Sequence, residues 1–301
     1  MGIRHRWDGI LIKDLPGFRK INPYVMKGRN ESAVYYPDEI ELDKTLAYIR
    51  DYNRRRKPGQ KVISLFHVIL AAAVRTIAFR PQANRFVSGR LIYQRRAIEI
   101  SFVVKKDLTE EGQESTTKIA FSPFDTIADV AEKLHASVKA ARDKSGNDTD
   151  KEMDLVTSFP RFIVNTIVRV FRFLDYFGIA PKSMIETDPL YTSLFLANLS
   201  SLGLDAPFHH LYEWGTASVF FVMGKMKKKK VTAEDGNVVE KTIMEAKFTV
   251  DDRVSEGIYW ANTINMFKDF LSDPSALEEK PDIPEEILKE HMYDKWPKEK
   301  K

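Results

Sequence analysis

The chain has 301 residues, of which 43% are hydrophobic and 30% charged, so it can bury a large core as one big domain or as two small ones. It contains no cysteine, which excludes disulfide bonds, thiol nucleophiles and thiolate metal sites. This composition predicts a soluble globular protein.

The net charge of +4 is spread along the chain, and dense basic runs occur only at 54–57 and 227–230. Binding of nucleic acid needs such runs on one face with aromatic side chains between them, so no nucleic acid partner is expected. The first run fits the last turn of a helix, where the helix dipole favours cations, and the second fits an edge strand protected by its charge. Residues 1–6 lack an apolar signal core, and a cytoplasmic location is expected.

Hydrophobic periodicity predicts helices and strands along most of the chain. Asp43 is expected to cap a helix with the apolar face Leu46, Ile49 and Tyr52. The segment 65–79 is apolar almost all round, which predicts a buried central helix. Strands are predicted at 33–36, 98–104, 118–121 and before Asp251, and further helices at 126–142, 159–177 and 258–271.

The apolar segment 159–177 is interrupted by charged and polar residues that fall mostly on one helical face. This density of charge argues against a membrane span, which needs about 20 apolar residues. A helix of this kind packs on its own domain or on a partner subunit, or it lies on a membrane surface. Packing against protein is the favoured interpretation, and the membrane surface remains the alternative.

The segment 248–257 changes from alternating apolar residues to a charged turn that ends at Gly257, and a helical pattern follows. This order predicts a strand, a tight loop and a helix. Charged side chains in such a loop are held by two rigid elements, although a solvated turn gives the same pattern. Beyond residue 275 the chain is rich in Pro, Glu and Lys, which predicts a charged C-terminal tail or a short docking helix at 276–301.

The loop residues Asp251, Asp252, Arg253, Glu256 and Gly257 resemble the Asp-His-Arg-x-x-Asp-Gly signature of the catalytic domains of dihydrolipoyl acyltransferases, the core subunits of 2-oxo acid dehydrogenase complexes. The resemblance extends over about 10–275 and includes a segment with an arginine near the start of the chain and a Ser-Leu-Gly segment at 201–203. It implies an α/β fold of the chloramphenicol acetyltransferase type, a two-layer domain in which helices cover a mixed sheet. It also implies one domain at 1–275 with an apolar helical insertion near 155–180, and no lipoyl domain is seen ahead of it.

The resemblance assigns roles to individual residues. Asp252 stands where the family has its catalytic histidine, which takes the proton from the thiol of coenzyme A or dihydrolipoamide. Ser200 takes the position of the serine that stabilises the oxyanion. Arg19 and Glu256 take the positions of the ion pair that holds the loop, and a buried pair of that kind is worth about 3–5 kcal/mol.

The replacement of histidine by aspartate puts catalysis in question. General-base catalysis contributes about 10²–10⁴-fold, and Asp252 could supply it only if burial raised its pKa strongly, which nearby arginines oppose. His209 and His210 form a rival pair, because His-His-x-x-x-Trp-Gly superficially resembles the His-His-x-x-x-Asp-Gly signature of chloramphenicol acetyltransferase. No third ligand is spaced to make them a metal site, and none is expected.

The resemblance therefore implies an acyltransferase that uses coenzyme A or an acyl-CoA as substrate, with an unknown acceptor, and a homotrimer with active-site channels between subunits. Because the catalytic loop is altered, two alternatives remain open: a non-catalytic homologue that binds acyl-CoA or scaffolds an assembly, and a protein of the membrane surface. No cofactor-binding residue is assigned.

Overall fold

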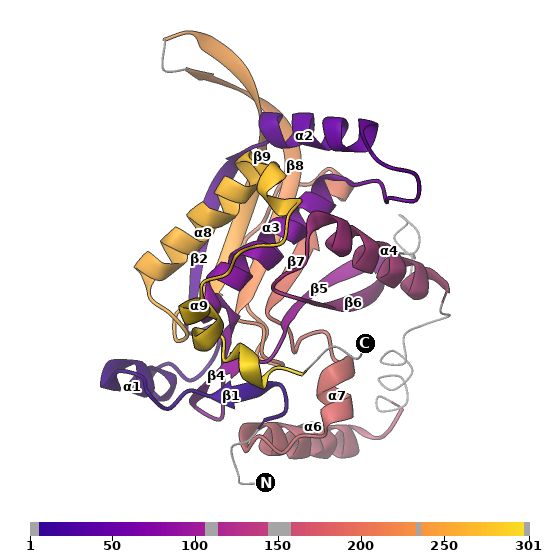
Figure 1. Ribbon diagram of the computed structural model, residues 1–301. Helices are drawn as coiled ribbons and strands as arrows, with labels where there is room; N and C mark the ends of the chain where they lie inside the picture. The colour runs from indigo at the N-terminus through magenta and orange to yellow at the C-terminus, as the bar shows by residue number, and fades with distance from the viewer. Residues whose placement is uncertain (1–5, 106–113, 144–157, 233–235, 298–301) are drawn as a thin grey trace.

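A computed structural model describes residues 6–105, 114–143, 158–232 and 236–297. A six-stranded mixed sheet runs through the middle of the molecule, with strands in the order β2-β9-β8-β7-β5-β6 (Figure 1). Its strands are β2 (Ala33–Glu41), β5 (Ile98–Lys105), β6 (Glu114–Phe121), β7 (Leu194–Asn198), β8 (Val219–Thr232) and β9 (Val238–Asp251). β7 pairs in parallel with β5 and β8, and the other pairs are antiparallel. The predicted mixed α/β architecture is confirmed.

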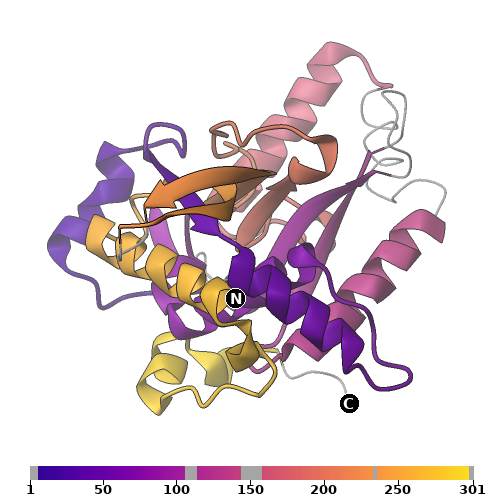
Figure 2. The same ribbon diagram turned by 90° about the horizontal axis from the view of Figure 1, so that it is seen from above.

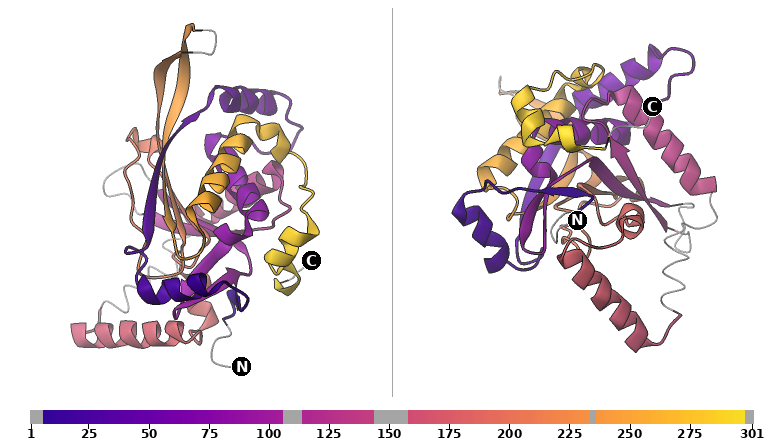
Figure 3. Two further views of the ribbon diagram at one scale, coloured as in Figure 1. Left: turned by 90° about the vertical axis from the view of Figure 1, so that its left-hand side faces the viewer. Right: turned by 60° about the horizontal axis from the view of Figure 1, so that its bottom comes forward.

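Four helices cover one face of this sheet (Figures 2 and 3, left). They are α2 (Asp43–Arg54), α3 (Leu65–Phe79), α4 (Ile127–Asp143) and α8 (Gly257–Ser272). β9 shows why the layers associate, because Met244, Ala246 and Phe248 alternate along the strand and all enter the same core cluster as α3. The periodicity had predicted the helices within about two residues.

Asp43 lies in the first turn of α2 and does not cap it, which corrects the prediction. Its carboxylate accepts hydrogen bonds from the backbone N–H and the hydroxyl of Thr242 in β9, at 3.1 and 2.8 Å. These bonds hold the pKa of Asp43 below its usual value. The side chain therefore ties the helix to the sheet, a contact that the local sequence does not reveal.

A small three-stranded sheet lies at the base of the molecule (Figure 1). It consists of β1 (Gly9–Leu11), β3 (Arg85–Ser88) and β4 (Leu91–Arg95), and the helix α1 (Gly17–Val25) lies beside it. A 3₁₀ turn, Pro81–Asn84, joins α3 to β3. Since β3 and β4 form a two-residue hairpin, the chain reverses here before it enters the large sheet.

The predicted apolar helix is α6 (Arg161–Tyr176), followed by α7 (Lys182–Thr187). Figure 3 (left) shows α6 projecting from the base of the molecule. Within α6, only Phe171 is buried, where it stacks on Trp214 at a ring-centroid distance of 4.9 Å. Phe162, Val170 and Phe173 are exposed. In the described part of the chain, no helix is both long and apolar enough to cross a membrane.

β7 stops pairing with β8 at Met223 and β2 stops pairing with β9 at Ile243, and beyond these points the hairpin of β8 and β9 extends past the rest of the sheet (Figure 1). The basic run 227–230 lies on this extension, where Lys227 pairs with Glu245 at 2.7 Å. The predicted hairpin is confirmed by the register up to Thr232 and Val238, while residues 233–235 lie outside the described residues.

Residues 274–297 return along the outside of α3. This segment contains the 3₁₀ turns Pro274–Leu277 and Tyr293–Lys295 and the helix α9 (Glu285–Glu290). Leu277, Ile283 and His291 are buried, and Nε2 of His291 contacts the carbonyl oxygens of Ile77 and Ala78 at 3.1 and 3.0 Å. The C-terminal segment is thus part of the packed domain as far as it is described.

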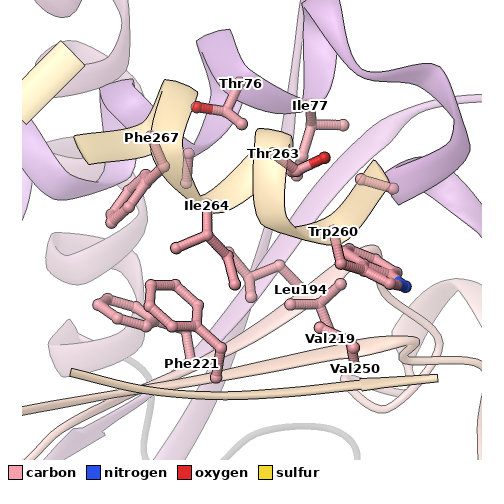
Figure 4. A pocket seen from close by; sticks show the side chains of 13 residues that line it. Thr76, Ile77, Leu194, Val219, Phe221, Val250, Trp260, Thr263, Ile264 and Phe267 are labelled. Carbon is pink, nitrogen blue, oxygen red and sulfur yellow. The ribbon is translucent and has the colours of Figure 1, made fainter. Parts of the chain in front are cut away.

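An apolar void of about 60 Å³ lies between α3, α8 and the sheet, lined by Trp260, Phe221 and Ile264 among others (Figure 4). An apolar cavity of about 150 Å³ is known to hold benzene, so this volume is too small for an organic ligand of that size. The void is a packing gap of the core.

Candidate active site

The loop between β9 and α8 is held by a buried ion pair. Asp251 and Arg253 are both almost wholly buried, and Nε and Nη2 of Arg253 donate to the two carboxylate oxygens of Asp251 at 2.8 and 2.7 Å. Arg253 Nη1 also donates to the carbonyl oxygens of Met26 and Lys27. This two-pronged geometry fixes the loop against the segment after α1.

Asp252 stands between the two members of this pair and is only partly buried. Its backbone N–H donates to Ser32 O at 2.9 Å, and its carbonyl oxygen accepts from Arg19 at 3.3 Å. Burial raises the pKa of the Asp252 carboxyl, against the lowering effect of the Arg19 charge, and the Asp251 charge raises it further. Burial and the Asp252 charge also raise the pKa of Tyr36, the phenol nearby.

Arg19 and Glu256 form the ion pair that the resemblance implied, with Arg19 Nη2 and Glu256 Oε2 3.2 Å apart. The Arg19 side chain is 18% exposed, but that of Glu256 is 66% exposed. The energy of about 3–5 kcal/mol belongs to the buried limit and does not apply to this pair, because water already solvates the carboxylate. The buried pair of the loop is Asp251–Arg253.

The substitution Glu256→Gln is accordingly expected to lower the free energy of unfolding by no more than about 1 kcal/mol, the usual range for an exposed ion pair. Urea denaturation of the two proteins measures this difference. A loss of several kcal/mol would show that the pair is buried in solution, for example by a second copy of the chain.

Ser200 begins a 3₁₀ turn, Ser200–Leu202, directly after β7. The turn ends at Gly203, which has a φ of +69° and so adopts the left-handed conformation that glycine favours. Ser201 donates its hydroxyl hydrogen to Asn198 O at 3.1 Å. Both hydroxyls thus lie where β7 leaves the sheet, and it is Ser201 that lines the adjacent cavity.

This cavity has a volume of about 950 Å³ and lies where β5 and β7 diverge. The two strands pair only from Ile100 to Phe102 and from Leu194 to Leu196. Beyond these pairs, Val103 and Val104 of β5 and Ala197 and Asn198 of β7 line the opening. Most of the wall is apolar, as is usual for a site that binds an organic ligand, with a few polar groups of Asn198, Ser201, His67, His135 and His209.

In one chain, the serine turn and the Asp252 loop are far apart. Asn198 lies opposite Met223, which lies opposite Ala246, and Asp252 is six residues further along the chain. At about 3.3 Å per residue, the separation is roughly 20 Å or more. Ser200 and Asp252 therefore do not meet within one copy of the chain.

His209 lines the cavity, and His210 is not among its lining residues. The His209 ring stacks on Phe220 at 3.8 Å, and its Nδ1 contacts His210 O at 2.7 Å. Burial lowers the pKa of His209, so the ring is neutral near pH 7. In the described parts of the chain, no three His, Asp or Glu side chains gather in a way that could hold a metal ion.

Sequence reasoning missed a second pair of histidines on the cavity wall. His67 of α3 and His135 of α4 have ring centroids 5.1 Å apart. His67 completes a capping box, because its Nδ1 accepts a hydrogen bond from the backbone N–H of Ser64 at 3.1 Å. Burial, with a smaller effect of His135, lowers the pKa of His67 to about 4. The capping residue Ser64 three positions before His67 was visible in the sequence, but His135 is far away along the chain.

The sheet, its helices and the β9–α8 loop define a fold of the chloramphenicol acetyltransferase type. A chloramphenicol acetyltransferase superposes with a TM-score of 0.55 at 13% identity, covering 87% of this chain and 99% of that chain. A probable dihydrolipoamide acetyltransferase from Listeria monocytogenes gives 0.57 at 13% identity, covering 86% and 94%. A truncated catalytic core of the 2-oxoacid dehydrogenase complex from Thermoplasma acidophilum gives 0.53 at 12% identity, covering 87% and 98%.

Residues 196–278 match the family model of the 2-oxoacid dehydrogenases acyltransferase (catalytic domain). This region contains the serine turn and the Asp252 loop. The search of curated proteins gave no match. The resemblance recognised in the sequence is confirmed, and with it the predicted fold.

Proposed function

We propose that the protein transfers an acyl group from an acyl-CoA thioester to an acceptor, in a site that two copies of the chain build together. One observation carries this proposal: a large apolar cavity ends at a turn with two hydroxyls, and the carboxylate loop of the same chain lies roughly 20 Å or more away. A second copy is then needed to bring Asp252 to the cavity. The family match over both segments supports this arrangement.

Exposed apolar side chains flank both halves of the proposed site. Phe18 precedes Arg19 in α1 and is 75% exposed, and Ile258 follows the loop at 69%. Leu202, Leu204 and Phe208 are exposed on the side of the serine turn. Apolar surface of this kind marks interfaces, and joining two different patches head to tail closes a ring. The proposed assembly is a homotrimer.

In the proposed reaction, the Asp252 carboxylate takes the proton from the acceptor as the acceptor attacks the thioester carbonyl carbon. The resulting oxyanion accepts a hydrogen bond from a hydroxyl of the serine turn of the neighbouring copy. When the tetrahedral intermediate collapses, the carbon–sulfur bond breaks and the thiolate of coenzyme A takes the proton. The raised pKa of Asp252 makes it a better base than a solvated carboxylate, although it starts from 3.8.

A second candidate is binding of acyl-CoA without transfer. It is favoured by the Arg19 charge, which opposes the rise that burial causes in the pKa of Asp252 and so limits proton uptake. Both candidates require the cavity, and only the first requires proton transfer.

Light scattering should give a particle of three times 34.7 kDa, and acetyl-CoA with dihydrolipoamide as acceptor should give measurable transfer. Replacing Ser200 and Ser201 together by alanine should lower the rate about 10²-fold or more through loss of the oxyanion donor, and Asp252→Asn should remove the base. If these two inactive chains are co-expressed in equal amounts, the whole pool of rings should regain about one quarter of the wild-type rate, because a shared site takes one half from each of two chains and each half is intact in one chain of two.

A mixture as inactive as its parents, in rings shown to contain both chains, would exclude a shared site. Titration of acetyl-CoA to the wild-type protein separates the two candidates, because tight binding with no transfer supports the second one. No binding and a monomeric mass would contradict both.

A further inference from the structure

A second cavity, of about 350 Å³, lies where α6 meets the hairpin of β3 and β4 and the segment after α1. It is separate from the cavity between β5 and β7, and none of its lining residues belongs to that cavity. Its cationic lining consists of Lys27, Arg29, Arg90, Arg172 and Arg253, and its other lining includes Asp175, Glu213, Tyr176, Tyr191 and Trp214.

The carboxylates of this wall are already occupied. Asp175 pairs with Arg6 at 2.7 Å, and Glu213 accepts the backbone N–H groups of Arg29 and Asn30 at 3.2 and 2.9 Å. Asp251 neutralises Arg253. In the described regions of the chain, no ion pair compensates the remaining four cations, Lys27, Arg29, Arg90 and Arg172. The cavity therefore carries excess positive charge.

Arg29 makes this excess unusual, because its guanidinium is buried. The residue is 8% exposed, its Nη2 donates to Val87 O at 3.0 Å, and its Nε has no hydrogen-bond partner. Burial lowers the pKa of Arg29. The charges of Asp251, Asp175 and Glu213 oppose this effect, but none of these carboxylates bonds to the guanidinium. A buried guanidinium with an unbonded N–H is stabilised by a bound anion, so the cavity is suited to one.

Arg90 lines the same cavity and has a strained backbone conformation. It has a φ of +61°, and the preceding Gly89 has a φ of +55°, so the two form the loop of a hairpin in which glycine or asparagine is favoured. A Cβ at Gly89 would lie 2.0 Å from Tyr176 O, which shows that α6 packs directly on this loop. An arginine in the left-handed region is unfavourable, and strain of this kind clusters at ligand sites.

We propose that this cavity binds the phosphate group of an organic phosphomonoester. Guanidinium groups match phosphate oxygens with paired hydrogen bonds, and the excess positive charge of the wall attracts a doubly charged anion. The volume exceeds that of phosphate itself, and Trp214, Tyr176 and Tyr191 offer an aromatic wall to the organic part. The phosphate can come from a soluble nucleotide or from a phospholipid headgroup, since α6 exposes apolar side chains beside the cavity. This site does not depend on the proposed acyl transfer.

The first test measures thermal unfolding in sodium phosphate and in sodium chloride of the same ionic strength. Phosphate should raise the midpoint of the wild-type protein above that in chloride. Arg172→Gln should weaken phosphate binding about tenfold or more, because it removes a charge-assisted bond. The matched control is Arg169→Gln, which removes the same charge from the same helix outside the cavity and should leave binding unchanged.

Arg90→Gly is the sharper variant, because glycine adopts a φ of +61° without strain. Its midpoint in chloride should not fall, while its response to phosphate should be lost. Two further measurements identify the source of the phosphate group. Calorimetric titration measures the binding of adenosine 3′,5′-bisphosphate, and flotation measures the binding of phosphatidylcholine vesicles with and without phosphatidate. The partner that binds more tightly is the source. Equal unfolding midpoints of the wild type in phosphate and in chloride would overturn the proposal. A response to phosphate that is unchanged in Arg90→Gly and Arg172→Gln would also overturn it, even if vesicles bind through α6.

Discussion

Replacing Asp252 by histidine is expected to raise the rate of acyl transfer to dihydrolipoamide about 100-fold. A general base works best when its pKa lies near the working pH, and imidazole, with an ordinary pKa of about 6.5, is closer to this optimum than a carboxyl. Although burial raises the pKa of Asp252, the Arg19 charge limits that rise. A coupled assay of coenzyme A release measures both proteins at neutral pH.

The pH dependence should change with the base. In the wild-type protein the active form is the carboxylate, so the rate should be level near neutral pH and should fall only in acid, at a pH above the 3.8 of an unperturbed carboxyl. In the histidine variant the active form is the neutral ring, so the rate should already fall below about pH 6.5. Asp252→Asn, with a side chain of equal size and no basic group, is the control for both.

Equal rates for the wild type and Asp252→His, with unchanged binding of acetyl-CoA, would contradict a role of this position in proton transfer. A wild-type rate that falls about 100-fold in His209→Ala but is unaffected by Asp252→Asn would assign the base to His209, which lines the cavity.

The substitution Arg253→Met is expected to lower the free energy of unfolding by about 3–5 kcal/mol. It leaves the Asp251 carboxylate buried without its partner, and it removes the bonds to Met26 O and Lys27 O that join the loop to the segment after α1. Urea denaturation with the linear extrapolation measures the loss.

The double variant Asp251→Leu with Arg253→Met tests the reason for this loss. Because the cost arises from an unpaired buried charge, the double variant should be more stable than either single one. Additive losses would mean that the two side chains stabilise the loop independently. The exposed pair Arg19–Glu256 provides the contrast within the same loop.

The sequence by itself determined the elements around the site. The alternating apolar residues before Asp251 predicted β9, and the helical period after Gly257 predicted the loop and α8. The apolar run 65–79 predicted α3. Such patterns are readable because side chains on one face repeat every two residues in a strand and every 3.6 residues in a helix. The loop signature, with aspartate in place of histidine, was also readable without a structure.

Only the tertiary structure decided which charges are buried. Asp251 and Glu256 look alike in the sequence, but the pairing of β9 with β2 and β8 encloses Asp251, while Glu256 lies at the start of α8 and faces water. The same holds for Arg29, since the cavity around it joins the hairpin of β3 and β4, α6 and residues 213–215. Burial depends on neighbours distant in the chain, and no local pattern records them.

The separation of Ser200 from Asp252 within one chain was likewise fixed by strand register. Ser200 and Asp252 are 52 positions apart in the chain, a separation that allows them to meet or to lie apart. β7, β8 and β9 place the serine turn at one end of the central strands and the carboxylate loop at the other. The cavity exists because β5 and β7 stop pairing after three residues, which depends on what each strand pairs with on its other side. The physical reason is that a sheet fixes distances through the pairing of strands, whereas the sequence specifies only which segments become strands.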